Sequence, residues 1–166
     1  KDFRIHNYTA YSDANYWNDK MNSSGGSYMG NPTGIYCKDL NPLYVFVDGD
    51  VPEKATLYMA GCVDNDLISN AKTGKKLTKG LNIVDGTKDA LYYILYTADT
   101  KDKTKKLSEW PAIKIHIQGG TVNGYYDSSR HTDKDYLALL SKASHELFTI
   151  KGKESLFHFQ RNTYKQ

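Results

Sequence analysis

The sequence predicts a mainly β protein: an antiparallel, jelly-roll-like β-sandwich with one amphipathic helix near its C-terminus and a short helix near its N-terminus. Two observations carry this prediction. From residue 34 onward, short segments alternate apolar and polar residues with a period of two, and turn-forming residues separate them. The 166 residues also include 14 tyrosines, a residue type that favours the half-buried surfaces of pleated sheets.

Seven segments between residues 34 and 126 have the length and alternation of strands. The clearest is Ala112–Gln118, in which every second residue is isoleucine. Glycine, proline and aspartate turns separate the segments, as expected for short antiparallel connections. The predicted strands are Gly34–Lys38, Leu43–Asp48, Ala55–Val63, Leu81–Val84, Ala90–Thr97, Ala112–Gln118 and Val122–Tyr126.

Helical patterns flank this region. Ser12 is a suitable N-cap for a short helix over Asp13–Met21. Thr132, with Asp135 three residues later, forms a variant of the capping box and begins a helix near residues 132–147. Its apolar stripe repeats at helical spacing and should pack on the sandwich. The stripe consists of Tyr136, Leu140, Ala143 and Leu147, and a last strand is predicted over Glu154–Gln160.

The composition fits one compact domain, in which residues 1–33 form an extension packed on a sandwich made by residues 34–166. A net charge of +3, from 22 basic and 19 acidic residues, is too balanced for a nucleic-acid-binding protein. The sequence contains no run of 18 apolar residues that could span a membrane, and it carries no signal peptide. Because it begins at Lys1 rather than at Met, we interpret it as part of a longer protein.

The sequence lacks a complete catalytic motif. Zinc peptidases carry His-Glu-x-x-His on a helix, but after His145 and Glu146 the fifth position is Thr149, so the second histidine ligand is missing. Gly-x-Ser-x-Gly, the nucleophile elbow, does not occur. The remaining histidines have no metal-ligand spacing, and we interpret them as hydrogen-bonded or solvated. They are His6, His116, His131 and His158.

Two acidic turns could supply oxygen ligands to a structural calcium ion, although neither matches an EF-hand loop. They span residues 64–66 and 48–50, and polar turns without a cation are the alternative.

A group of aromatic and polar residues near the predicted loops is the candidate site for sugar contact. Flat rings at one end of a sandwich can stack on sugars, and amide or carboxylate groups can bind their hydroxyls. The alternative is that these side chains pack beneath the loops. The candidates are Trp110, Asn123, Tyr125, Tyr126 and Asp127.

Cys37 and Cys62 both fall on predicted strands. A disulfide between them requires Cα atoms within roughly 7 Å, and two buried thiols are the alternative. The sequence leaves both states open. The absence of Cys-x-x-Cys argues against a thioredoxin-like or zinc-ribbon role.

The order of several segments resembles the N-terminal portion of the enhancin-type, mucin-degrading zinc metallopeptidases. The resemblance covers roughly residues 4–159, and its most specific parts are Asn31–Tyr36 (Asn-Pro-Thr-Gly-Ile-Tyr) and the glycine-rich turn before Tyr125. The other segments that carry it are Leu43–Gly49, Leu77–Asn82, Ala90–Tyr96, Ile113–Gly120 and the helix near Thr132.

This resemblance implies a β-sandwich module beside a catalytic domain, in a secreted, periplasmic or surface protease of a host-associated bacterium. The zinc and its His-Glu-x-x-His helix would lie in the catalytic domain of the same polypeptide, so no cofactor is expected in this chain. Mucin-type O-glycoproteins are the implied substrates. We therefore expect an accessory, non-catalytic module, and the alternative is a stand-alone carbohydrate-binding or adhesion module.

Overall fold

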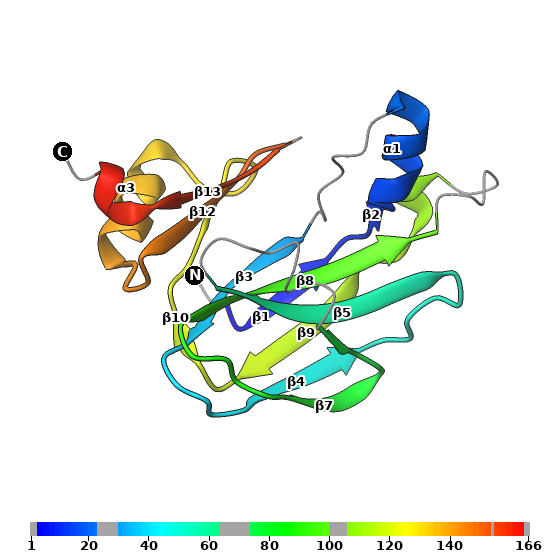
Figure 1. Cartoon of the computed structure of the whole chain (residues 1–166), viewed down its shortest axis with the longest axis horizontal. Coiled ribbons are helices and arrows are strands. Elements are labelled where there is room, and N and C mark those ends of the chain that lie inside the picture. The colour runs from blue at the N-terminus through cyan, green and yellow to red at the C-terminus, as the bar shows by residue number, and fades with distance from the viewer. Residues whose placement is uncertain (1–2, 23–29, 64–73, 100–105, 154, 165–166) are drawn as a thin grey trace.

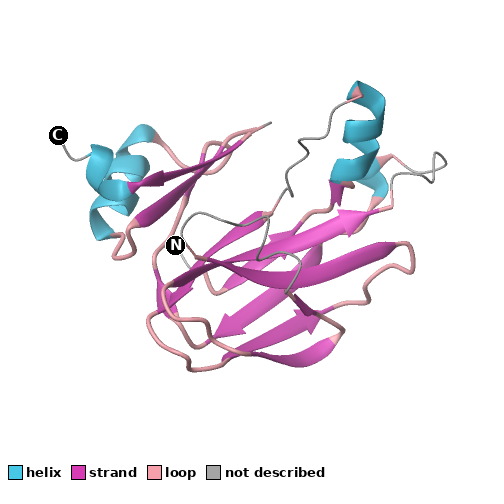
Figure 2. Cartoon of the chain, viewed as in Figure 1, coloured by secondary structure: helices cyan, strands magenta, loops and turns pink. Residues whose placement is uncertain are grey.

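The computed structural model describes residues 3–22, 30–63, 74–99, 106–153 and 155–164. Two β-sheets pack face to face, and a smaller lobe with a helix and a hairpin lies at one end of them (Figures 1 and 2). The protein is mainly β, as the sequence predicts.

One sheet, called sheet A here, has four antiparallel strands. Their order is β1 (Ile5–Tyr8), β9 (Ile113–Gln118), β4 (Leu43–Asp48) and β7 (Gly80–Val84). The side chains of β4 alternate strictly between buried and exposed. This period of two follows from the pleat, so one face of sheet A lies in the core and the other faces solvent.

The second sheet, sheet B, is built around β8 (Ala90–Ala98). Its order is β10 (Thr121–Val122), β3 (Asn31–Cys37), β8, β5 (Ala55–Cys62) and β6 (Lys75–Lys76), and β2 (Tyr11–Ser12) pairs with β8 in parallel. Eight of the nine residues of β8 are buried. Strands that are buried on both faces read as continuous apolar runs, which is the pattern of β8.

The connections make a jelly roll. Sheet A contributes β1, β9, β4 and β7, sheet B contributes β3, β8, β5 and β6, and most consecutive strands lie in opposite sheets. These eight strands define the fold by their alternation between two facing sheets and confirm the predicted class, and β2 and β10 add to sheet B. The core between the sheets includes Val45, Ile115, Leu57 and Tyr96.

Part of the predicted N-terminal extension, residues 1–33, lies in the sheets instead of packing on them. β1 pairs with β9, and β2 pairs with the end of β8. A short helix, α1 (Ala14–Met21), follows β2 as predicted. The predicted strand Val122–Tyr126 is instead divided between β10 and β11 (Tyr126–Asp127), with three residues between them in neither strand.

The C-terminal lobe combines a helix with a three-stranded sheet. Helix α3 (Asp133–Lys142) packs on β11, β12 (Leu147–Lys151) and β13 (Leu156–Gln160). A short 3-10 helix, η2 (Arg161–Tyr164), follows β13, and another, η1 (Leu107–Glu109), precedes β9 of sheet A. The N-cap prediction is confirmed, because the Thr132 hydroxyl accepts a hydrogen bond from the backbone N–H of Asp135. The predicted length is wrong, because Leu147 lies on β12.

No helix in the described part of the chain is long and apolar enough to cross a membrane.

Candidate functional site

Four of the five residues predicted to contact sugar are buried: Trp110, Asn123, Tyr125 and Asp127. Trp110 and Tyr125 belong to the core between the sheets, and the Tyr125 ring packs against Phe3 with centroids 5.3 Å apart. Tyr126 is partly exposed, but its ring meets Tyr136 edge to face at 5.3 Å. These five side chains do not form an open aromatic platform. The four buried ones are packed inside the protein, as in the alternative to sugar contact given by the sequence. Sugar contact by Tyr126 stays a prediction.

Asn123 connects the sandwich to the lobe. Its Oδ1 accepts hydrogen bonds from the backbone N–H groups of Ser144 and His145, both at 2.9 Å, and its Nδ2 donates to the Leu147 carbonyl at 3.1 Å. The backbone at Asn123 is held in turn, because its N–H donates to the Gly34 carbonyl at 2.7 Å. A buried asparagine with its hydrogen-bonding groups engaged in this way is a structural residue.

The glycine in the Asn31–Tyr36 segment allows this close approach. Gly34 has a φ of +71°, and a Cβ built on it would lie 3.0 Å from the Cα of Gly124. Only glycine takes up such a backbone conformation without strain and leaves room for the facing chain. This segment of β3, irregular in its pairing with β8, therefore positions the 123–124 turn and with it the lobe.

A cluster of ionisable side chains, the seam cluster, joins β1 to the lobe. It consists of His6, Tyr125, Asp127, Arg130 and Lys151. Nη1 of Arg130 lies 3.0 Å from each ring nitrogen of His6, and the Tyr125 hydroxyl lies 3.4 Å from Nε2. The Asp127 carboxylate accepts hydrogen bonds from the backbone N–H and hydroxyl of Ser129.

Burial and charge shift the pKa values in the seam cluster. Burial, with the nearby Arg130 and Lys151, lowers the pKa of His6 to about 4. Burial raises the pKa of Tyr125 to about 12 and lowers that of Lys151. Such shifts are common at functional sites and also in structural networks. The sequence analysis missed this cluster because its members lie up to 145 residues apart and share no motif.

The His145-Glu146 pair does not fit a catalytic zinc site. Nδ1 of His145 accepts a hydrogen bond from the Leu147 N–H at 3.0 Å, so Nε2 carries the proton and donates to the Asp89 carbonyl at 2.9 Å. Both ring nitrogens are engaged, and the pair lies after the end of α3 rather than on it. No group of three or more potential metal ligands gathers within the residues that the structure describes. We therefore derive no zinc chemistry for these residues.

In the acidic turn that the structure describes, the aspartates lie close to lysine side chains. Asp48 lies 3.8 Å from Nζ of Lys114, and Asp50 lies 3.1 Å from Nζ of Lys79. The turn at residues 64–66 lies outside the described residues.

The two cysteines are buried thiols that form no disulfide, the second of the two states left open by the sequence. Cys37 pairs with Ala90 and Cys62 with Leu91, its neighbour on β8. Successive residues of a strand point to opposite faces of a sheet, so the two thiols do too. Cys37 accordingly lies in the core between the sheets, and Cys62 lies in the cluster on the outer face of sheet B.

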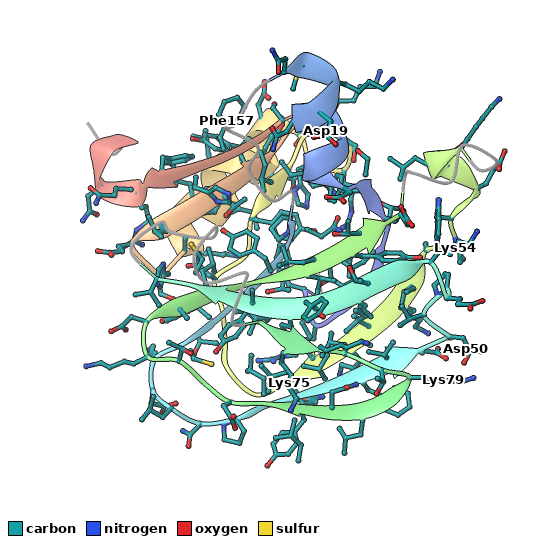
Figure 3. The ribbon with its side chains drawn as sticks, turned by 45° about the vertical axis from the view of Figure 1, so that its right-hand side comes forward. Asp19, Asp50, Lys54, Lys75, Lys79 and Phe157 are labelled. Atoms are coloured by element: carbon teal, nitrogen blue, oxygen red, sulfur yellow. The ribbon has the colours of Figure 1, made fainter. Side chains whose placement is uncertain are left out.

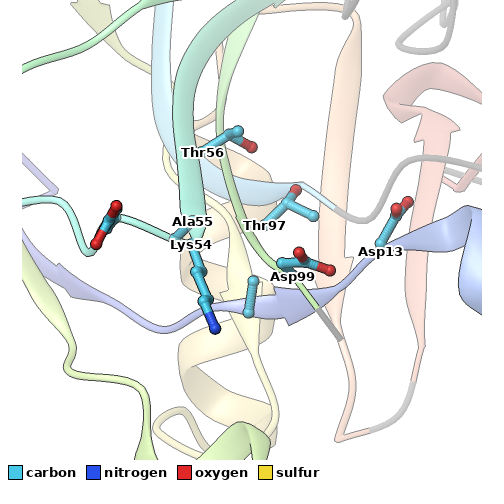
Figure 4. Close-up of a pocket in the computed structure, with 8 residues that line it drawn as sticks. Asp13, Lys54, Ala55, Thr56, Thr97 and Asp99 are labelled. Carbon is cyan, nitrogen blue, oxygen red and sulfur yellow. The ribbon is translucent and has the colours of Figure 1, made fainter. Parts of the chain in front are cut away.

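Two hollows in the described part of the chain are large enough for a small ligand. The first, of about 470 Å³, lies where β5 and β8 meet the start of α1. Its lining includes the carboxylates of Asp13 and Asp99 with the hydroxyls of Thr56 and Thr97 (Figure 4). These groups can bind hydroxyls of a small polar ligand.

The second hollow, of about 600 Å³, lies between sandwich and lobe and is lined by Tyr36, Lys88, Ser144, His145 and Glu146, among others. The rings of Tyr36 and His145 lie 5.1 Å apart and are buried. This hollow therefore offers hydrogen-bonding and charged groups rather than an open ring face.

No protein-family model and no curated protein matches this sequence. Among solved structures, a metallopeptidase from Bacteroides thetaiotaomicron has a TM-score of 0.77 at 30% identity, over 96% of this chain and 27% of that chain. A metallopeptidase solved in complex with Tn antigen has the same TM-score and identity, over 96% of this chain and 30% of its own. The ZmpB metallopeptidase from Clostridium perfringens shares the fold, with a TM-score of 0.68 at 15% identity, over 96% of this chain and 34% of that chain.

These three structures are metallopeptidases, and this chain spans about a third or less of the length of each of them.

Proposed function

We propose that this chain is the non-catalytic β-sandwich module of a secreted or surface-exposed, enhancin-like zinc metallopeptidase that acts on mucin-type glycoproteins. The module braces the catalytic domain of the same polypeptide and helps to present the glycoprotein to it. The observation that most directly supports this proposal is the likeness to the Bacteroides thetaiotaomicron metallopeptidase, at 30% identity over 96% of this chain but only 27% of that one.

The chemistry of the described side chains supports an accessory role. His145 begins the segment that most resembles a zinc-binding motif. Both of its ring nitrogens form hydrogen bonds that hold β12 and the loop before β8. The most connected polar side chain in the predicted site, Asn123, holds the lobe in place. Both residues therefore hold parts of the fold together, which is the role expected of a scaffold.

The first experiment is to sequence the gene beyond the codon for Gln166. We expect a His-Glu-x-x-His motif within the next few hundred codons. Activity of the encoded polypeptide on an O-glycosylated mucin peptide is then compared with that of the same polypeptide lacking residues 1–166. We expect metal-dependent cleavage that falls at least tenfold on deletion, with the catalytic domain still folded.

Other results distinguish the alternatives. A stop codon or a second binding domain directly after the codon for Gln166 would remove the peptidase proposal and favour the stand-alone carbohydrate-binding or adhesion module. In that case the isolated chain should bind mucin-type glycans on an array. Metal-dependent cleavage by the isolated chain would contradict the non-catalytic role.

A further inference from the structure

The outer face of sheet A carries an exposed apolar patch. Tyr44 and Phe46 of β4 are 46% and 50% exposed, and Leu81 and Ile83 of β7 are 63% and 52% exposed. Tyr44 lies directly opposite Ile83, and Phe46 directly opposite Leu81, so the four side chains are contiguous. Ile5 of β1, 44% exposed, extends the patch across His116 of β9, which pairs with both Ile5 and Phe46. We call these five residues the sheet A patch.

The outer face of sheet B differs from that of sheet A because lobe residues pack on it. On sheet B, Tyr36, Tyr93 and Leu95 are buried in one cluster with Leu147 of the lobe. The C-terminal lobe thus covers this part of the outer face of sheet B. Within the described residues, the sheet A patch has no comparable cover. Contiguous apolar surface of this kind marks an interaction site in soluble proteins.

Four polar side chains of this face lie close to one another in two pairs. Lys114 lies 3.8 Å from Asp48, and the Gln118 amide lies 2.9 Å from the His116 ring. Beside the patch, Lys79 and Asp50 pair at one end of the sheet (Figure 3). An apolar surface can therefore dock here without leaving an unpaired charge, which is the main cost of burying polar groups.

The size of the face indicates what kind of partner covers it. Four strands about 4.8 Å apart and five residues about 3.3 Å apart give a face of roughly 19 Å by 17 Å, or about 300 Å² on each partner. Stable complexes between separate chains bury roughly 1,200–2,000 Å² in total, whereas domains within one chain meet over roughly 600–1,500 Å². The face is too small for a stable dimer and large enough for a tethered domain, for which the linker supplies a high effective concentration.

We infer that the sheet A patch is the docking surface for an apolar face of a further domain in the same polypeptide. This inference rests on the proposed function and names the surface through which the module braces its partner. The partner presents a flat apolar surface opposite β4 and β7.

The inference can be tested by hydroxyl-radical footprinting of the isolated chain and of the longer polypeptide. We expect the labelling of Tyr44 and Phe46 to fall at least fivefold in the longer polypeptide. Phe157, 58% exposed on β13 of the lobe, is the reference and should keep its labelling rate. Equal labelling of Tyr44 and Phe46 in both proteins, or protection of Phe157 alone, would overturn the inference.

A double variant, Phe46→Lys with Leu81→Lys, tests whether this surface holds the two domains together. In the longer polypeptide it should speed proteolysis between the domains at least about tenfold, because two large apolar side chains lose their burial. The matched control is Leu137→Lys, at a residue 67% exposed on α3, which should leave the rate unchanged. In the isolated chain, the double variant should melt within a few degrees of the parent.

Two results separate this inference from the proposed function. If the gene encodes no further domain, the proposed function fails. If a peptidase domain is present and active but Tyr44 and Phe46 stay fully labelled, only the docking inference fails. A dimer of the isolated chain in sedimentation, with the patch protected, would replace the tethered domain by a second copy.

Discussion

Asn123 is the residue on which the position of the lobe depends most directly. Its side chain makes three hydrogen bonds to backbone groups of residues 144, 145 and 147, where the chain leaves α3 and enters β12. Since it is buried, water cannot easily replace these bonds when the side chain is removed.

We expect Asn123→Ala to lower the free energy of unfolding by about 2–3 kcal/mol, because it leaves buried backbone groups without partners. Urea denaturation followed by circular dichroism measures this. The control is Asn7→Ala, at an exposed position of β1, which should change the stability by less than about 0.5 kcal/mol. If Asn123→Ala removed glycan binding while stability stayed unchanged, the residue would belong to a sugar site instead.

His6 makes the stability depend on pH. In the folded protein its pKa is about 4, because burial and Arg130 disfavour the protonated ring, whereas the unfolded chain binds the proton near pH 6.5. Between these values the unfolded state binds more protons, so stability falls as the pH drops from about 6.5 to 4. Because the ring is only partly buried, we expect a loss of the order of 1 kcal/mol from this residue.

The measurement is the free energy of unfolding at pH 7 and at pH 4.5 for the parent and for His6→Asn, which cannot be protonated in this range. The variant should lose less stability on acidification than the parent. Burial also lowers the pKa of His158, so part of the decrease should remain. His116→Gln, on the outer face of sheet A, serves as the control, and an equal decrease in parent and His6→Asn would contradict the role of His6.

At the scale of elements, local sequence predicts where a structure begins better than where it ends. The start of α3 is encoded by Thr132 and Asp135, which contact each other and need no distant partner. Its end is not local, because the N–H groups that follow the helix bond to Asn123, twenty residues earlier or more. The apolar stripe continued to Leu147 at helical spacing, and only the pairing of β12 with β11 and β13 makes that residue part of a strand.

The candidate site illustrates the same limit. The sequence places aromatic and polar residues near the predicted loops, but it does not show that Trp110 and Tyr125 are buried in the core between the sheets, because that burial depends on contacts with distant residues. The pairing of β1 with β9, and the seam cluster that it brings together, join residues more than 100 positions apart. The strands themselves were largely predictable, because their period-two alternation is a local signal that survives in the fold.

At the scale of the whole molecule, the question is whether the lobe and the sandwich unfold together. Leu147 is buried against Leu91, Tyr93 and Leu95 of sheet B, while Leu140 is buried within the lobe. The Tyr93 hydroxyl adds a buried link, because it lies 2.8 Å from the Thr149 hydroxyl and 2.9 Å from Nδ1 of His158. Apolar burial and a buried polar network at one interface favour a single cooperative transition.

We therefore expect Leu147→Ala and Leu140→Ala each to lower the stability by about 2–4 kcal/mol, the usual cost of truncating a buried leucine. In both variants, circular dichroism and tryptophan fluorescence, to which the core residue Trp110 contributes, should report one coincident transition. An early transition in circular dichroism alone, produced by Leu140→Ala, would show that the lobe melts independently. A lobe that melts with the sandwich keeps the outer face of sheet B covered for as long as the protein is folded. The outer face of sheet A then remains the surface through which such a module can be joined to another domain.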